Sequence, residues 1–121
     1  MAKLLVIDDE RLNRLTLRKI LERGHHEVVD AANGAEGLKL AKSEAFDLVI
    51  TDVVMPTMEG IETITLLKRA FPNLPIIAMS GSAATRNHDN LELALSAGAD
   101  QVLPKPFTSE KLLAAVASIL A

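Results

Sequence analysis

Five short apolar runs, which alternate with amphipathic stretches long enough for helices, constrain the fold of this chain most strongly. The runs are rich in Val, Ile and Leu and predict strands near residues 3–8, 27–31, 47–52, 75–80 and 101–104. The stretches that follow them predict helices near residues 10–23, 35–44, 60–71, 89–97 and 108–120. Strands that alternate with helices in this way are typical of a parallel sheet covered by helices on both faces. The sequence therefore predicts a three-layer α/β sandwich.

The last predicted helix has the clearest apolar face. Its members lie at helical spacing and are Leu112, Leu113, Val116, Ile119 and Leu120. Thr108 precedes this helix and can cap its N-terminus, and Gly24 can end the first predicted helix. Because no repeat, linker or low-complexity tract interrupts the pattern, we expect one domain over residues 1–121.

The composition excludes several classes of function. The chain has no Cys, no signal-like N-terminus and no apolar run of membrane-spanning length, so we expect a cytoplasmic protein without thiolate metal sites. Its net charge is -3 and its basic residues are scattered, which disfavours binding of nucleic acid or of a membrane. It contains no Trp or Tyr to stack on bases or on a flavin ring. We therefore expect its partners to be proteins.

Reactive side chains follow four of the apolar runs. Asp8 and Asp9 follow the first run, Asp52 the third, Ser80 the fourth and Lys105 the fifth. In an open α/β sheet, sites lie outside the carboxyl ends of the strands, so we expect these groups to meet in one crevice. Three carboxylates, a hydroxyl and an ammonium suit a divalent cation together with a phosphoryl group.

Each of these residues also has an explanation that involves no function. Asp8 or Asp9 could cap the first helix, and Asp52 and Ser80 could belong to turns. Two adjacent carboxylates exceed what one cap needs, however, and a bound cation would relieve their mutual repulsion. Lys105 lies between two prolines, which constrain the backbone that aims its side chain.

Four separated motifs, taken together and in this order, resemble the receiver domain of two-component response regulators. They are VIDDE at residues 6–10, DVVMPTMEG at residues 52–60, MSG at residues 79–81 and KPF at residues 105–107. Each motif follows an expected strand, and the resemblance covers essentially the whole chain. It implies a flavodoxin-like, doubly wound, five-stranded parallel sheet with strand order 2-1-3-4-5.

The resemblance also implies roles for the reactive residues. Asp52 would be the phosphoacceptor, since a carboxylate is a competent nucleophile toward phosphorus. Mg²⁺ would be held by oxygen atoms of Asp8, Asp9 and Asp52 and by the backbone carbonyl of Val54, in part through water. Lys105 and the Ser80 hydroxyl would contact phosphoryl oxygens, and the Lys105–Pro106 peptide bond would be cis.

The implied function is phosphorelay signal transduction. A sensor histidine kinase or a phosphotransfer protein would donate the phosphoryl group, and the modified domain would switch a protein-interaction surface for a downstream protein or effector domain. Beyond phosphoryl transfer to itself and autodephosphorylation, no enzymatic activity is expected. The chain ends at Ala121 directly after the last predicted helix, so a stand-alone regulator and a receiver cut from a longer polypeptide would share these signals.

Two features differ from the pattern of many relatives. Val102 occupies the position three residues before the lysine, where those relatives carry an aromatic residue. The segment from Ser80 to Gly98 is also longer than in those relatives, and it contains a loop of a kind that tolerates changes of length. We interpret His25, His26 and His88 as solvated surface residues.

Two other classes of protein are alternatives. Asp8 followed by Glu10 faintly resembles the paired acids of Asp-nucleophile phosphohydrolases of the haloacid dehalogenase type, which normally carry a second Asp at the later position. A flavodoxin-like electron carrier would need a hydroxyl-rich phosphate loop after the first strand, where this chain has acidic residues.

Overall fold

The computed structural model describes residues 2–53, 59–82 and 88–121. Its strands are β1 (Lys3–Ile7), β2 (Glu27–Ala31), β3 (Leu48–Asp52), β4 (Ile76–Ser82) and β5 (Gln101–Lys105). Its helices are α1 (Arg11–Arg23), α2 (Gly34–Ser43), α3 (Glu59–Ala70), α4 (His88–Ala97) and α5 (Ser109–Leu120). Within the described ranges, none of these helices has the length and hydropathy needed to cross a bilayer.

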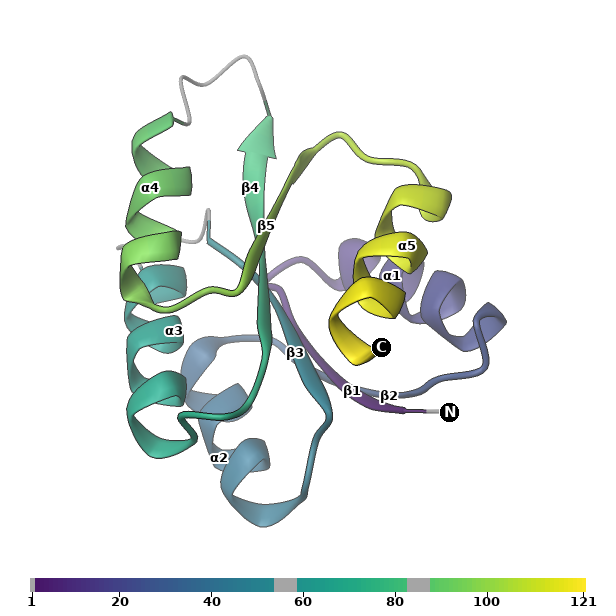
Figure 1. The fold of residues 1–121 in the computed structure, drawn as a ribbon. Helices are drawn as coiled ribbons and strands as arrows, with labels where there is room; N and C mark the ends of the chain where they lie inside the picture. The colour runs from purple at the N-terminus through teal and green to yellow at the C-terminus, as the bar shows by residue number, and fades with distance from the viewer. Residues whose placement is uncertain (1, 54–58, 83–87) are drawn as a thin grey trace.

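The strands form one parallel sheet in the order β2-β1-β3-β4-β5, which confirms the predicted fold class and strand order. Helices α1 and α5 lie on one side of the sheet, and α2, α3 and α4 lie on the other (Figure 1). The chain therefore builds the three layers that the alternation of strands and helices predicts.

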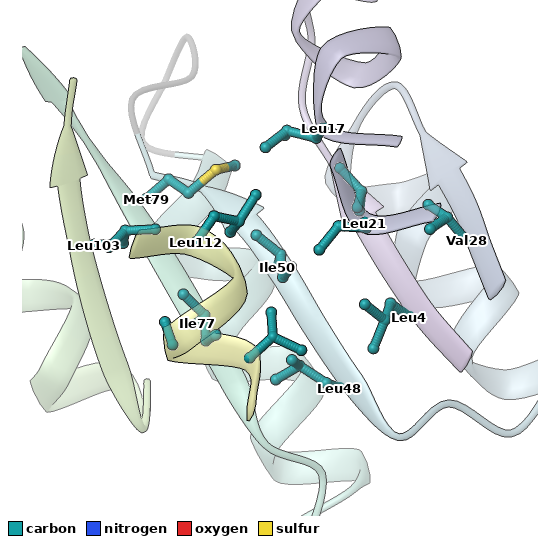
Figure 2. Packing of buried hydrophobic residues seen from close by; sticks show 13 residues of the cluster. Leu4, Leu17, Leu21, Val28, Leu48, Ile50, Ile77, Met79, Leu103 and Leu112 are labelled. Atoms are coloured by element: carbon teal, nitrogen blue, oxygen red, sulfur yellow. The ribbon is translucent and has the colours of Figure 1, made fainter. Parts of the chain in front are cut away.

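Two apolar cores occupy the two faces of the sheet, because successive side chains of a strand point to opposite faces. In β1, Leu4 and Val6 belong to the core under α1 and α5, whereas Leu5 and Ile7 belong to the core under α2, α3 and α4. Figure 2 shows Leu112 of α5 among the side chains of the first core. All five residues of β3 are buried, which explains why its sequence is a continuous apolar run up to Thr51 and Asp52.

The helix ends follow the sequence signals with one exception. Thr108 is the N-cap of α5, as predicted, and its side chain accepts a hydrogen bond from the backbone N–H of Lys111 at 3.1 Å. Helix α1 ends at Arg23, as Gly24 predicts, but the left-handed residue is His25, with φ of 70°, rather than the glycine.

The surface interpretation of the histidines holds for His25, which is exposed, but is wrong for His26. The side chain of His26 is half-buried, and burial lowers its pKa. The side chain of His88 lies outside the described part of the structure.

Strand β4 differs most from its predicted range, because it continues to Ser82 instead of ending at Ser80. Its pairing with β5 is irregular at that point: Ser80 pairs with Pro104, and Ser82 pairs with Lys105. One extra residue on β4 at this edge is typical of a β-bulge, a local irregularity that is frequent beside functional sites.

Helix α2 packs against β1 at Gly37, where a Cβ atom would lie 2.8 Å from Cγ1 of Ile7 and still closer to its Cδ1. We predict that Gly37→Ala lowers the free energy of unfolding by up to about 2 kcal/mol, because an overpacking cost of about 1–3 kcal/mol outweighs a helix-propensity gain of about 0.5–1 kcal/mol. Ile7→Val removes Cδ1, so the loss in the double variant should be smaller than the sum of the losses in the two single variants. Thermal unfolding of both single variants and of the double variant checks this, and a stabilised Gly37→Ala protein would contradict the close packing.

Candidate functional site

The carboxyl ends of three strands place the predicted charged residues together. Asp8 follows β1, Asp52 is the last residue of β3, and Lys105 is the last residue of β5. The Nζ atom of Lys105 lies 3.1 Å from Oδ2 of Asp52, although β4 separates their two strands. The structure therefore brings the ammonium of one motif onto the carboxylate of another.

Three carboxylates form a cluster at this edge. Asp8, Asp9 and Asp52 each offer one oxygen atom, and these oxygens lie within 4.8 Å of one another. Asp8 is fully buried and Asp52 is 4% exposed, whereas Asp9 is exposed. Oxygen atoms at such spacing can share a hard divalent cation.

Within the described part of the chain, Asp8 makes three hydrogen bonds with other residues. Its backbone N–H donates to the carbonyl of Ala31 at 3.1 Å, and its Oδ1 accepts from the backbone N–H of Glu10 at 2.9 Å. Its own carbonyl accepts from Nη1 of Arg14 at 2.8 Å. Its Oδ2 is buried and has no hydrogen-bond partner within the described residues. A buried carboxylate oxygen in that condition is costly unless a ligand satisfies it.

The capping explanation for the acidic pair is not supported. Glu10 occupies the N-cap position of α1, and its side chain makes no capping hydrogen bond. The side chain of Glu10 instead accepts from Nδ2 of Asn13 at 2.8 Å. Neither Asp8 nor Asp9 is the N-cap residue, so capping does not account for the pair.

The electrostatics of the cluster are unfavourable without a cation. Burial raises the pKa of the Asp8 carboxyl, and the charges of Asp52 and Asp9 raise it further. The backbone N–H of Glu10 and the ammonium of Lys105 act in the opposite direction without cancelling the rise. A divalent cation at this position would favour the ionised form instead.

The remaining predicted residues have different outcomes. Ser80 is buried on β4, one residue beyond Met79, which pairs with Asp52 of β3. The Lys105–Pro106 peptide bond is cis, as predicted. The carbonyl of Val54 and most of the long loop after Ser80 lie outside the described residues.

Val102, which replaces the aromatic residue of many relatives, lies on β5 opposite Ala78 of β4. It is half-buried and packs against the core under α2, α3 and α4. A short branched side chain thus fills this place on the sheet.

Two residues near the site were not identified from the sequence. Arg14 lies in the first turn of α1 and donates to the carbonyl of Asp8. No sequence pattern predicts such a contact from an arginine on a helix face. Gly60, in the first turn of α3, leaves no room for a side chain: a Cβ atom there would lie 2.5 Å from Cα of Val53. The sequence signal that could have identified Gly60 is its place in the motif of residues 52–60, because a glycine at a strand–helix junction can indicate a close approach of two backbone segments.

Comparisons with known proteins agree with this geometry. The family described as the response regulator receiver domain matches residues 4–117. The response regulator MprA of Mycolicibacterium vanbaalenii is 36% identical over 119 residues, which cover 98% of this chain and 50% of that protein. This chain thus spans about half the length of such relatives.

Solved structures show the same similarity. A response regulator receiver domain protein from Clostridium thermocellum is 33% identical, with a TM-score of 0.90 over 99% of this chain and 94% of that one. The response regulator TrrA from Thermotoga maritima, in complex with Mg²⁺ and BeF, is 32% identical, with a TM-score of 0.86 over 99% of this chain and 100% of that one.

The match over residues 4–117 agrees with the sheet order and with the gathering of Asp52 and Lys105 at one edge. It identifies a signalling family in place of a haloacid dehalogenase or a flavodoxin. The chain belongs to the response regulator receiver domain family of two-component signalling systems.

Proposed function

We propose that residues 1–121 form one receiver domain that accepts a phosphoryl group on Asp52 in a Mg²⁺-dependent reaction. The observation that carries this proposal is the convergence on one buried carboxylate of an ammonium at 3.1 Å and two further carboxylates. A phosphoryl group needs both positive charge and a nucleophile, and this edge of the sheet offers the two together.

The residues fit a magnesium ion. Asp8 presents a buried Oδ2 that has no partner among the described residues, and Asp8, Asp9 and Asp52 each offer one carboxylate oxygen within 4.8 Å of the others. All of these donors are hard oxygens, which Mg²⁺ prefers. We infer that the backbone carbonyl of Val54 completes the protein ligands, with water in the other positions. When bound, the ion would neutralise the carboxylates and offset negative charge on phosphoryl oxygens.

Asp52 would act as the nucleophile. One of its carboxylate oxygens forms a bond to phosphorus, the bond from phosphorus to the donor's imidazole nitrogen or other leaving group breaks, and an aspartyl phosphate results. Lys105, which contacts Asp52 in this structure, would then pair with an oxygen of the phosphoryl group. The hydroxyl of Ser80, buried on the adjacent strand, would donate to another of those oxygens.

The donor would be a sensor histidine kinase or a phosphotransfer protein, and the product would present an altered surface to a downstream protein or effector domain. Membership of the family supports both kinds of partner. The net charge of -3 and the absence of Cys support a cytoplasmic protein that does not bind nucleic acid directly.

Phosphorylation of Asp52 can be tested with a small phosphodonor such as acetyl phosphate. We predict that intact mass shows one added phosphoryl group on the wild-type protein with Mg²⁺, and none when EDTA replaces the metal or when Asp52→Asn is used. Asp47→Asn is the matched control, because Asp47 precedes the same strand at its opposite end and bonds to the backbone N–H of Lys3. Equal labelling of the Asp52→Asn protein would refute the assignment.

The unfavourable ionisation of Asp8 predicts a pH-dependent effect on stability without metal. Asn at position 8 keeps the acceptor for Glu10 but removes the buried charge beside Asp52, so Asp8→Asn should raise the metal-free Tm at pH 7 by several degrees. The pKa of Asp8 is raised in the folded state, so protonation of Asp8 stabilises the fold. This stabilisation is fully present at a pH below the ordinary pKa of 3.8, and it is lost as the pH rises through the pKa of the folded protein. The gain in Tm should therefore shrink as the pH falls toward 3.8.

Thermal unfolding in EDTA at several pH values measures this effect. Asp9→Asn is the matched control, because it removes the same charge from an exposed side chain and should change Tm much less. A lower Tm for Asp8→Asn at pH 7, or an equal gain for both variants, would show that burial of Asp8 is not the cause.

A further inference from the structure

Arg14 connects the acidic loop after β1 to strand β2. Its Nη1 atom donates to the carbonyl of Asp8 at 2.8 Å, and its Nε atom lies 3.7 Å from Oδ2 of Asp30. The side chain is only 17% exposed, so the guanidinium is largely shielded from water. Arg14 therefore holds a backbone carbonyl while a carboxylate on the neighbouring strand holds Arg14.

The carbonyl that Arg14 contacts belongs to the peptide group that joins Asp8 to Asp9. The orientation of this peptide group sets the direction in which both carboxylates leave the chain. Asp8 makes two other hydrogen bonds: its N–H donates to the carbonyl of Ala31, and its Oδ1 accepts from the N–H of Glu10. Its carbonyl bonds to Arg14. Among these bonds, the one from Arg14 is the one supplied by a side chain of another residue, so a substitution can remove it.

We propose that Arg14 is a positioning residue for the Mg²⁺ site: it fixes the Asp8–Asp9 peptide so that both carboxylates face the cation. This inference rests on the proposed function, because it concerns the same site. Residues that orient metal ligands from behind typically change metal affinity by roughly 10- to 100-fold when they are replaced.

The effect of the charge of Arg14 on Mg²⁺ affinity can be distinguished from the effect of its hydrogen bond to the carbonyl of Asp8. A nearby positive charge repels a divalent cation, so loss of that charge alone would tighten Mg²⁺ binding. Loss of the positioning bond would weaken it. The two effects have opposite signs, and the inference predicts that the loss of positioning dominates.

Arg18 is a matched control on the same helix. Its Nη2 lies 3.4 Å from Oδ1 of the same Asp30, and its Nη1 donates to the carbonyl of Val28 at 2.8 Å. Like Arg14, it donates to a backbone carbonyl and pairs with Asp30, but its carbonyl belongs to Val28 of β2 instead of Asp8. Replacement of either arginine removes one carbonyl bond and one ion pair with Asp30, and replacement of Arg18 also removes a solvent-exposed ion pair with Glu22 at 3.2 Å.

The experiment titrates MgCl₂ into wild-type, Arg14→Gln and Arg18→Gln proteins at constant ionic strength and follows backbone amide shifts by NMR, since the chain has no Trp. We expect roughly tenfold weaker Mg²⁺ binding for Arg14→Gln, and unchanged or slightly tighter binding for Arg18→Gln. The Tm of the metal-free protein should fall in both variants, because both lose a carbonyl bond and an ion pair with Asp30, and the exposed pair of Arg18 with Glu22 adds little.

The outcomes separate the inference from the proposed function. If the wild-type protein binds Mg²⁺ and Arg14→Gln binds it equally well or more tightly, the role of Arg14 is overturned and the magnesium site stands. Equal weakening in both variants shows a general effect of helix α1 and also overturns it. A wild-type protein that shows no saturable Mg²⁺ binding overturns the proposed metal site, and the inference with it.

A further variant keeps the test decisive if Arg14→Gln does not fold. Arg14→Lys retains a donor for the carbonyl of Asp8 but lacks a second nitrogen for Asp30. Its Mg²⁺ affinity should be lower than that of the wild type, with a smaller loss than full removal of the donor causes. Wild-type affinity in a folded Arg14→Lys protein whose metal-free amide shifts at residues 8–10 have changed would overturn the inference.

Discussion

Parallel pairing of the five strands is the constraint on which the rest of the structure depends. It buries β3 on both faces and directs the carboxyl ends of all strands to one edge. Asp8, which follows β1, therefore lies near the last residues of β3 and β5, and both Asp8 and Asp52 are buried there. Two aliphatic cores, one on each face, stabilise a sheet whose functional edge is electrostatically unfavourable.

The surroundings of the site hold this unfavourable arrangement in place. Lys105 reaches across β4 to offset the charge of Asp52, and the bonds of Asp8 to its neighbours fix its backbone. These contacts satisfy every polar atom of Asp8 except Oδ2, for which the described residues supply no partner. Preorganised ligands of this kind do not have to reorganise when a cation binds, which favours binding.

The sequence predicted the features that depend on local pattern. Apolar runs revealed the strands because both faces of the sheet are buried, and Thr108 revealed the start of α5 because capping is local chemistry. The extension of β4 to Ser82 was not predictable, since its pairing with β5 depends on a bulge. The left-handed His25 was missed because glycine usually takes that conformation, and the contact from Arg14 was missed because it joins a helix face to a loop.

The central claim is that the cluster of Asp8, Asp9 and Asp52 is a magnesium site, and the dependence of stability on Mg²⁺ tests it most directly. A cation that binds only the folded state raises the free energy of unfolding by about 2.7 kcal/mol at a hundred times its Kd, and by about 1.4 kcal/mol for each further tenfold increase. Denaturant unfolding of the wild-type protein across MgCl₂ concentrations, with NaCl at matched ionic strength as the control, should follow this logarithmic rise. A free energy of unfolding that stays the same from EDTA to millimolar Mg²⁺ would contradict the account.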